Sequence, residues 1–159
     1  MSTFTIRPYA AGDASYVSYL QMKFYTQSYG FKDIFEHYLL ASLAEFVLSD
    51  TSSQLWVALD GDTIVGSIAI VKTEKSTAQL RWFVFDPQYQ GKGIGKKLMD
   101  TAMLFCREQE YRHVFLWTIQ ILDAARHLYE KYGFLQTETK PNTEWTGETL
   151  LEERWDLHW

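Results

Sequence analysis

The chain has little cysteine and no long apolar run, and each shortage excludes a class of protein. Its one cysteine, Cys106, excludes an intrachain disulfide and any metal site built from several cysteines. No window approaches the ~20 apolar residues of a membrane-spanning helix, and the N-terminal residues contain no apolar core of a signal peptide. These absences favour a cytoplasmic protein that is not integrated in a membrane.

Positive charge is also scarce, because 15 Lys and Arg face 20 Asp and Glu, giving a net charge of -5. Nucleic acids and anionic membranes attract clustered cations, so this balance argues against both partners and mildly favours amine ligands. Aromatic residues are abundant, at 16% of the chain, and most should lie in the core while a few line a substrate pocket. A length of 159 residues predicts one domain, 1–159, with a single core.

Apolar periodicity and turn residues divide the chain into alternating strands and helices. We expect strands at 4–8, 55–59, 63–71, 78–85, 113–118, 134–139 and 150–157, and helices at 14–24, 33–48, from 96, and 124–132. Asp60-Gly61-Asp62 predicts a hairpin turn. Asp33, paired with Glu36 in a capping box, and Asp123 are predicted helix caps, and Gly133 is the predicted left-handed end of the last helix.

The run Gln90-Gly91-Lys92-Gly93-Ile94-Gly95 says most about function. It follows a strand that ends at Asp86-Pro87 and precedes a helix expected from Lys96. Glycines let the main chain approach an anion closely, and unpaired amides at the start of the helix then face that anion. The run therefore predicts a pyrophosphate site.

Two other phosphate-binding motifs fit this run poorly. A dinucleotide-binding G-x-G-x-x-G fingerprint needs glycine where Lys96 stands. A nucleotide phosphate loop needs glycine at Gln90 and a hydroxyl at Lys97. The alternative without a ligand is a tight connection from strand to helix.

The glycine run and its surroundings resemble the GNAT superfamily of acyl-CoA-dependent N-acyltransferases. The residues that carry the resemblance are Gln90, Gly93 and Gly95, Val84 and Asp86-Pro87 upstream, and Ala125 and Leu128-Tyr129-Glu130-Lys131-Tyr132-Gly133-Phe134 downstream. The stretches 78–81 and 116–118 are most similar to the acetyltransferase half of bacterial MarR/GNAT fusion proteins. The resemblance implies an α/β (α+β) fold, with a mixed, mostly antiparallel sheet of about seven strands flanked by four helices in the order β-α-α-β-β-β-α-β-α-β-β.

By the same resemblance, the chain is expected to transfer the acetyl group of acetyl-CoA to a primary amine, by direct attack in a ternary complex. A small-molecule acceptor is the leading expectation. The alternatives are a peptide or protein amine, or a noncatalytic acyl-CoA-binding regulatory module. A homodimer is an expectation of the family, and no metal is expected.

The resemblance also implies roles for individual residues. Tyr129 would donate a proton to the leaving thiolate, since a phenol with a pKa near 10 is protonated at neutral pH. A main-chain N–H near Trp82 to Val84 would bind the oxyanion. The residues expected to hold acetyl-CoA are Phe83, Val84, Phe85, Gln90, Gly91, Lys92, Gly93, Ile94, Gly95 and Lys96. Leu122 and Asp123 stand where many relatives carry an asparagine that contacts coenzyme A.

Acceptor binding is expected from the first two helices, their loop, and the segment around Trp145. The candidates are Tyr25, Tyr29, Phe31, His37, Arg81 and Trp145. Aromatic faces suit a cationic amine, whereas Arg81 would meet a carboxylate of the acceptor or of the protein. The general base stays open, because Trp117 and Thr118 occupy the stretch where some relatives place a glutamate. Candidates for the base are Glu36, His37, Glu74, Glu144 and a chain of water molecules.

Overall fold

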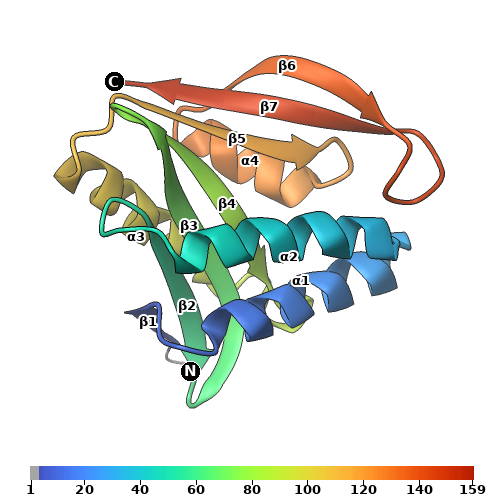
Figure 1. Cartoon of the computed structure of the whole chain (residues 1–159), viewed down its shortest axis with the longest axis horizontal. Coiled ribbons are helices and arrows are strands. Elements are labelled where there is room, and N and C mark those ends of the chain that lie inside the picture. The colour runs from blue at the N-terminus through green and yellow to red at the C-terminus, as the bar shows by residue number, and fades with distance from the viewer. Residues whose placement is uncertain (1–3) are drawn as a thin grey trace.

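The computed structural model describes residues 4–159 as a seven-stranded sheet with helices on both faces (Figure 1). The elements are β1 (Phe4–Pro8), α1 (Asp13–Tyr29), α2 (Asp33–Val47), β2 (Gln54–Asp60), β3 (Thr63–Glu74), β4 (Thr77–Phe85), the 3-10 turn η1 (Pro87–Tyr89), α3 (Ile94–Glu108), β5 (His113–Ile119), α4 (Asp123–Lys131), β6 (Leu135–Asn142) and β7 (Leu150–His158). The predicted order of strands and helices is confirmed. Among these helices, none has both the length and the apolar character needed to cross a membrane.

The strands lie in the order β1-β2-β3-β4-β5-β7-β6. Only β4 and β5 pair in parallel, and the other neighbours are antiparallel, as predicted for a mixed, mostly antiparallel sheet. The predicted hairpin joins β2 to β3, where Gly61 has a φ of 62° that suits its lack of a side chain.

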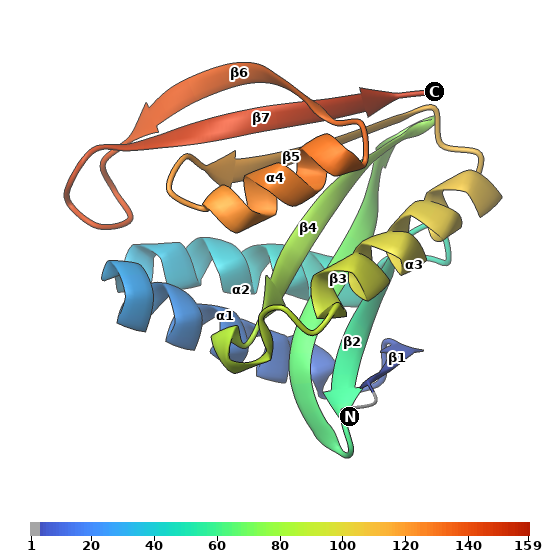
Figure 2. The same ribbon diagram turned by 180° about the vertical axis from the view of Figure 1, so that it is seen from behind.

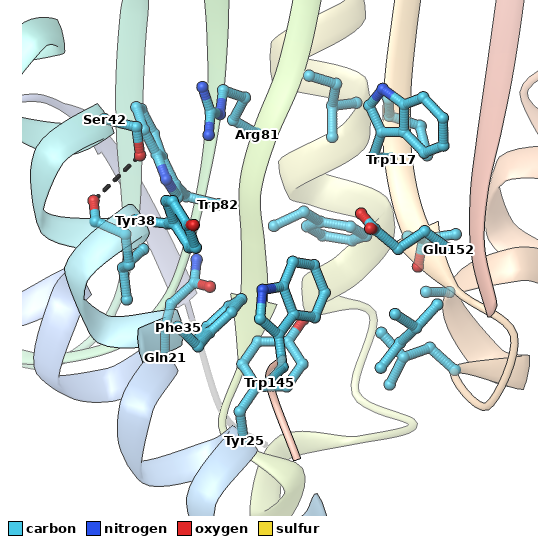
Figure 3. Close-up of a pocket in the computed structure, with 18 of the residues that line it drawn as sticks. Gln21, Tyr25, Phe35, Tyr38, Ser42, Arg81, Trp82, Trp117, Trp145 and Glu152 are labelled. Atoms are coloured by element: carbon cyan, nitrogen blue, oxygen red, sulfur yellow. Dashed lines mark hydrogen bonds between the residues drawn. The ribbon is translucent and has the colours of Figure 1, made fainter. Parts of the chain in front are cut away.

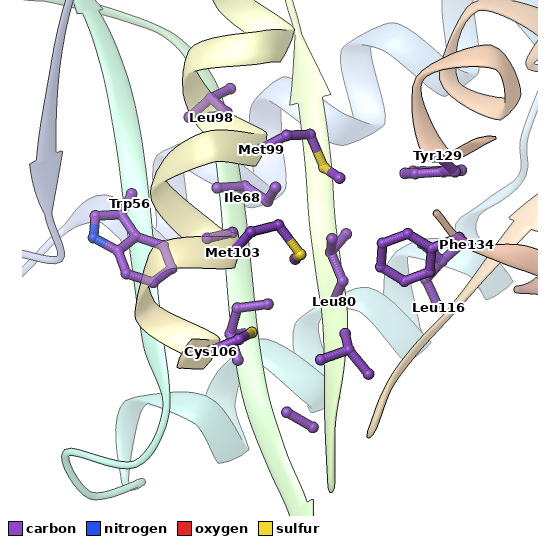
Figure 4. Packing of buried hydrophobic residues seen from close by; sticks show 14 of the residues in the cluster. Trp56, Ile68, Leu80, Leu98, Met99, Met103, Cys106, Leu116, Tyr129 and Phe134 are labelled. Atoms are coloured by element: carbon purple, nitrogen blue, oxygen red, sulfur yellow. The ribbon is translucent and has the colours of Figure 1, made fainter. Parts of the chain in front are cut away.

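The core has two parts, one on each face of the sheet. Helices α1 and α2 cover the face seen in Figure 1, and α3 and α4 cover the face seen in Figure 2. The second face buries Leu98 and Met99 of α3 beside Leu80 and Phe134 (Figure 4). The first face buries a cluster that includes Trp82. Each large buried side chain contributes about 1.5–3 kcal/mol, so the helices hold the sheet from both sides.

Several predicted helix ends are wrong. Helix α1 was expected to end at Phe24 but runs to Tyr29, where Gly30, with a φ of 70°, is its left-handed C-cap. Helices α2 and α4 begin at Asp33 and Asp123 themselves, so neither aspartate is an N-cap and no capping box forms. Each aspartate lies in the first turn, where its charge stabilises the helix dipole without a capping hydrogen bond. Helix α3 begins at Ile94, earlier than expected, because Gly93 adopts a φ of 83° and serves as its N-cap.

Strands β4 and β5 separate soon after they meet, and this separation positions the site. They pair only from Thr77 to Gln79 on β4 (Figure 2). Trp82 then has a φ of 49°, and the register with β3 shifts between Ser67 and Ala69. The Ser67 hydroxyl donates to the Trp82 carbonyl at 2.6 Å, which stabilises this bulge. Because a bulge bends its strand, β4 turns away from β5 and leaves a wedge between them.

Candidate active site

A cavity of about 290 Å³ lies where β4 and β5 diverge (Figure 3). Its walls come from β4 and β5, from α1 and α2, from α4, and from the β6–β7 hairpin. Four of the predicted acceptor-binding residues line it, namely Tyr25, Phe31, Arg81 and Trp145. Two others, Tyr29 and His37, do not line the cavity. Chain segments far apart in the sequence therefore meet around one space.

An aromatic cluster forms the wall nearest the end of α1. Tyr25 stacks on Phe31 with 4.8 Å between ring centroids, and Phe35 meets Trp145 edge-on at 5.0 Å. The Lys32 amide donates to the Trp145 carbonyl at 2.7 Å, which ties the β6–β7 loop to the start of α2. Tyr29 extends the cluster from outside the cavity, 6.3 Å from the Tyr25 ring. His37 is exposed and packs beside Tyr38 instead.

Tyr129 lines the cavity from α4 and is only 5% exposed. After this helix Gly133 is the left-handed residue, as predicted, with a φ of 92°, and the Phe134 amide donates to the Tyr129 carbonyl at 3.1 Å. Burial raises the pKa of the Tyr129 phenol far above its usual value, and the nearby Tyr25 hydroxyl raises it further. The phenol therefore stays protonated at neutral pH, so it can donate a proton but cannot serve as a base.

The glycine run forms the connection between η1 and α3. Gly91 and Gly93 both have positive φ angles, 80° and 83°. Within residues 4–159, the amides of Gly93, Ile94, Gly95 and Lys96 have no backbone acceptor, because the first helical bond runs from Lys97 to the Gly93 carbonyl. Four N–H groups and the positive end of the α3 dipole are thus open to an anion. Lys92 and Lys96 are exposed beside them.

Strand β4 runs from the cavity to the glycine run. Phe83 lines the cavity, and its ring lies 6.1 Å from that of Tyr129. Phe85 lies against Gly95, where an added Cβ would come within 3.2 Å of the Phe85 ring. The Val84 side chain is buried, so only its main chain is available at the β4 edge. The open edge and the free amides together fit an extended ligand that ends in a pyrophosphate.

Glu152 is a cavity residue that the sequence analysis missed. It lies on β7, is 8% exposed, and directs its carboxylate into the cavity (Figure 3). Its Oε2 accepts from Asn142 Nδ2 at 3.2 Å. The adjacent Glu153 accepts from Arg126 Nε at 2.8 Å and does not line the cavity. Strand alternation requires that two adjacent acids face opposite sides of the sheet, but only the strand register shows which one faces the cavity.

The four side chains suggested as general bases lie elsewhere. Glu36, His37, Glu74 and Glu144 are all exposed and do not line the cavity. Glu144 accepts from the Tyr38 hydroxyl at 3.3 Å on the protein surface. None of them is therefore placed to take a proton from a molecule held in the cavity.

One group within residues 4–159 is compact enough to hold a metal ion, and it consists of His113, Asp156 and His158. The group lies outside the cavity. Asp156 already accepts from Arg154 Nη2 at 3.1 Å and from the Thr137 hydroxyl at 2.5 Å. The Arg154 guanidinium would compete with a metal ion for this carboxylate. The expectation that the protein binds no metal stays a prediction.

Comparison with known proteins identifies the family. The model of the acetyltransferase (GNAT) family matches residues 15–134, so the chain belongs to this family, as predicted. N-acetyltransferase 8B of Rattus norvegicus is 32% identical over 106 residues, which cover 64% of this chain and 48% of that protein. N-acetylaspartate synthetase of Danio rerio is 33% identical over 99 residues, covering 62% and 35%. The matched region thus spans about half of these relatives or less.

Solved structures share the fold over nearly the whole chain. An acetyltransferase of the GNAT family from Staphylococcus aureus Mu50 has a TM-score of 0.80 and 19% identity, covering 98% of this chain and 99% of its own. A Salmonella typhimurium protein solved with its cofactor acetyl-CoA has a TM-score of 0.76 and 17% identity, covering 98% and 93%. At these identities the likeness establishes the fold.

Proposed function

We propose that the chain is an N-acetyltransferase that moves the acetyl group of acetyl-CoA to a primary amine of a small molecule, in a ternary complex. One observation carries the proposal: the cavity between β4 and β5 holds the Tyr129 phenol and the Glu152 carboxylate. The β4 edge joins this cavity to the open amides of α3. Family membership and relatives named N-acetyltransferases support it.

The proposal places acetyl-CoA on residues that were predicted to bind it. The amides from Gly93 to Lys96 would hold the pyrophosphate, aided by the α3 dipole, which contributes about 0.3–1 kcal/mol. The main chain of β4 from Phe83 to Phe85 would pair with the pantetheine arm in the manner of an added strand. The bound cosubstrate supplies an acyl thioester whose carbonyl carbon is open to attack.

The reaction removes two protons from the acceptor nitrogen and delivers one to the departing sulfur, and the cavity offers two side chains for these transfers. Glu152 accepts a proton from the ammonium form of the acceptor, and the neutral nitrogen then attacks the thioester carbonyl carbon. A main-chain N–H of β4 near the Trp82 bulge stabilises the resulting oxyanion by about 3 kcal/mol. As the carbon–sulfur bond breaks, the thiolate takes the Tyr129 proton. Tyr129 regains a proton from the newly acetylated nitrogen.

Three observations favour a catalytic role and a small acceptor. A regulatory module was the alternative because no carboxylate occurs near Trp117 in the sequence, yet Glu152 lines the same cavity as Trp117. The Trp145 loop bounds a space of only about 290 Å³. Relatives from Danio rerio and Rattus norvegicus are named N-acetylaspartate synthetases, which supports a small-molecule acceptor here. A cytoplasmic location and a homodimer remain predictions.

We expect the purified chain to release free thiol from acetyl-CoA when a suitable primary amine is present. A panel of amines read by thiol release, with the acetylated product identified by mass spectrometry, tests this expectation. Release without added amine is the background. Binding of acetyl-CoA with no turnover of any amine would favour the regulatory module instead.

Changing Glu152 to Gln should lower kcat/KM at pH 7 by about 100-fold to 10,000-fold, the usual size of general-base catalysis. The loss should shrink as the pH approaches 10, because an alkyl amine then deprotonates without help. Glu144→Gln is the control, since this exposed carboxylate lies outside the cavity. A loss that is equal at every pH would show that Glu152 does not act as the base.

A further inference from the structure

The positive and negative charges of the side chains that line the cavity are unequal in number. The charged side chains are Arg81, Lys140 and Glu152, two cations and one anion. The Lys140 ammonium lies 4.4 Å from the centre of the Trp117 ring, and Glu152 accepts from Asn142. A cavity with surplus positive charge attracts a simple alkyl ammonium poorly. An acceptor that also brings a negative charge would restore the balance.

Neither cavity cation has an acidic partner within residues 4–159, and Arg81 is the more buried of the two, since Lys140 is exposed. Arg81 is half-buried on β4, with its guanidinium 5.0 Å from the centre of the Trp82 ring. No ion pair or hydrogen bond joins its side chain to any other residue between 4 and 159. Burial lowers the pKa of this guanidinium, because the charged form loses hydration. Such a group gains strongly from a carboxylate, which it can bind through two parallel hydrogen bonds.

Gln21 gives an independent sign of a ligand on the same side of the cavity. This residue of α1 lines the cavity and is 5% exposed. Its Nε2 is a buried donor without a hydrogen-bond acceptor among residues 4–159. Leaving such a donor unpaired costs about 1–3 kcal/mol, so its position calls for an acceptor atom supplied by a ligand. Figure 3 shows Gln21 and Arg81 on the α1 and α2 side, with Glu152 and Trp117 opposite.

We propose that the acceptor is a primary amine that also carries a carboxylate, as an amino acid does, and that Arg81 and Gln21 bind this carboxylate. The amine end then faces Glu152 across the cavity. This inference rests on the proposed acetyl transfer, and it narrows the acceptor to one chemical class. The inference also revises the expectation that aromatic rings alone bind the amine, because Arg81 and Lys140 would repel an acceptor that carries only positive charge.

The first experiment compares each amino acid with its own carboxamide. The probes are the twenty standard amino acids with β-alanine and 4-aminobutyrate, each beside the amide in which the carboxylate is neutral. We expect kcat/KM for the best amino acid to exceed that of its amide by about 10-fold to 100-fold, the size of one charged hydrogen-bonded contact. If the amides or plain alkylamines are acetylated as well as the acids, the inference is wrong while the proposed function stands.

The second experiment changes the two recognition residues. Arg81→Gln should raise KM for the best amino acid by about 10-fold to 100-fold, while acetyl-CoA affinity and the rate with the carboxamide change less than threefold. Gln21→Met should raise the same KM and leave the melting temperature equal or higher, because an unpaired buried amide is removed. Arg107→Gln, an exposed change of the same charge outside the cavity, is the control.

A binding measurement keeps the inference testable if no acceptor is turned over. With coenzyme A present, the amino acids should raise the melting temperature of the wild-type chain but not that of Arg81→Gln. The absence of any shift from the whole panel would overturn the inference. Acetyl-CoA binding without turnover would instead count against the proposed function alone.

Discussion

Replacing Gly93 with aspartate should weaken acetyl-CoA binding by about 100-fold. The glycine is the exposed N-cap of α3, and the amides that follow it are free to hold a pyrophosphate. A carboxylate here places negative charge beside the phosphates, and two like charges about 5 Å apart cost about 3 kcal/mol near a protein surface. An aspartate side chain can also occupy the free amides itself, since aspartate is a good N-cap. Calorimetric titration with acetyl-CoA measures the loss.

Two variants separate this charge effect from backbone strain. Gly93→Ala carries the same strain from a φ of 83° without charge, and an added Cβ meets no atom within 4 Å, so most affinity should remain. Gly12→Asp places aspartate at the N-cap of α1, where the φ is 97°, and should leave acetyl-CoA binding unchanged. Gly95→Asp should also weaken binding, but crowding against Phe85 destabilises the fold as well. Unchanged affinity in folded Gly93→Asp would overturn the pyrophosphate assignment.

Tyr129→Phe should lower kcat by about 10-fold to 1000-fold while acetyl-CoA affinity changes little. In the proposed mechanism the phenol supplies the proton for the departing thiolate, whereas main-chain groups would hold most of the cosubstrate. The fold should survive, because the ring stays in place and the hydroxyl makes no hydrogen bond to another residue of the described chain. Steady-state kinetics with an identified amine, together with calorimetry, separate the two effects.

A matched change on the same part of the chain controls for loss of a phenol. Tyr132 follows α4, and its hydroxyl donates to the Lys96 carbonyl at 3.2 Å outside the cavity. Tyr132→Phe should therefore affect stability more than turnover. If Tyr129→Phe reacts at the wild-type rate while the chemical step is shown to be rate-limiting, Tyr129 only packs and another group donates the proton.

The wild-type pH profile should show no loss of activity from Tyr129 below pH 10. Burial raises the pKa of this phenol above its usual value near 10, so the donor form persists throughout that range. Any alkaline loss below pH 10 must then come from another group.

The sequence predicted the order of the elements and the glycine run because both depend on local signals. Alternation marks strands, helical spacing marks helices, and Gly93 is a local conformational requirement. The helix ends were less accurate, since an aspartate at the N-cap and one in the first turn both favour a helix start, and only the backbone distinguishes them. Asp33 and Asp123 both proved to lie in the first turn.

The acceptor side of the cavity depends on contacts that local signals do not carry. Tryptophan favours strands, so nothing in the sequence predicts the positive φ of Trp82, which a hydrogen bond from Ser67 holds in place. Glu152 and Glu153 have the same chemistry and neighbouring positions, and only the register of β7 against β5 decides which one faces the cavity. Gln21 belongs to no sequence motif, and it is recognised as a candidate only because its buried Nε2 has no hydrogen-bond acceptor among residues 4–159.

The divergence of β4 from β5 also bears on aggregation. A strand edge with unpaired amides and carbonyls can pair with a strand of another molecule. Many sheet proteins prevent this pairing with prolines, charges or bulges at the edge. Here two such edges lie within the sheet and face each other across a wedge, with the Trp145 loop and α4 beside them. A second protein molecule cannot bring a whole twisted strand into that space. A thin, flexible chain with amide groups of its own can enter, so the geometry that would admit a cosubstrate also keeps these two edges from pairing with a strand of another molecule.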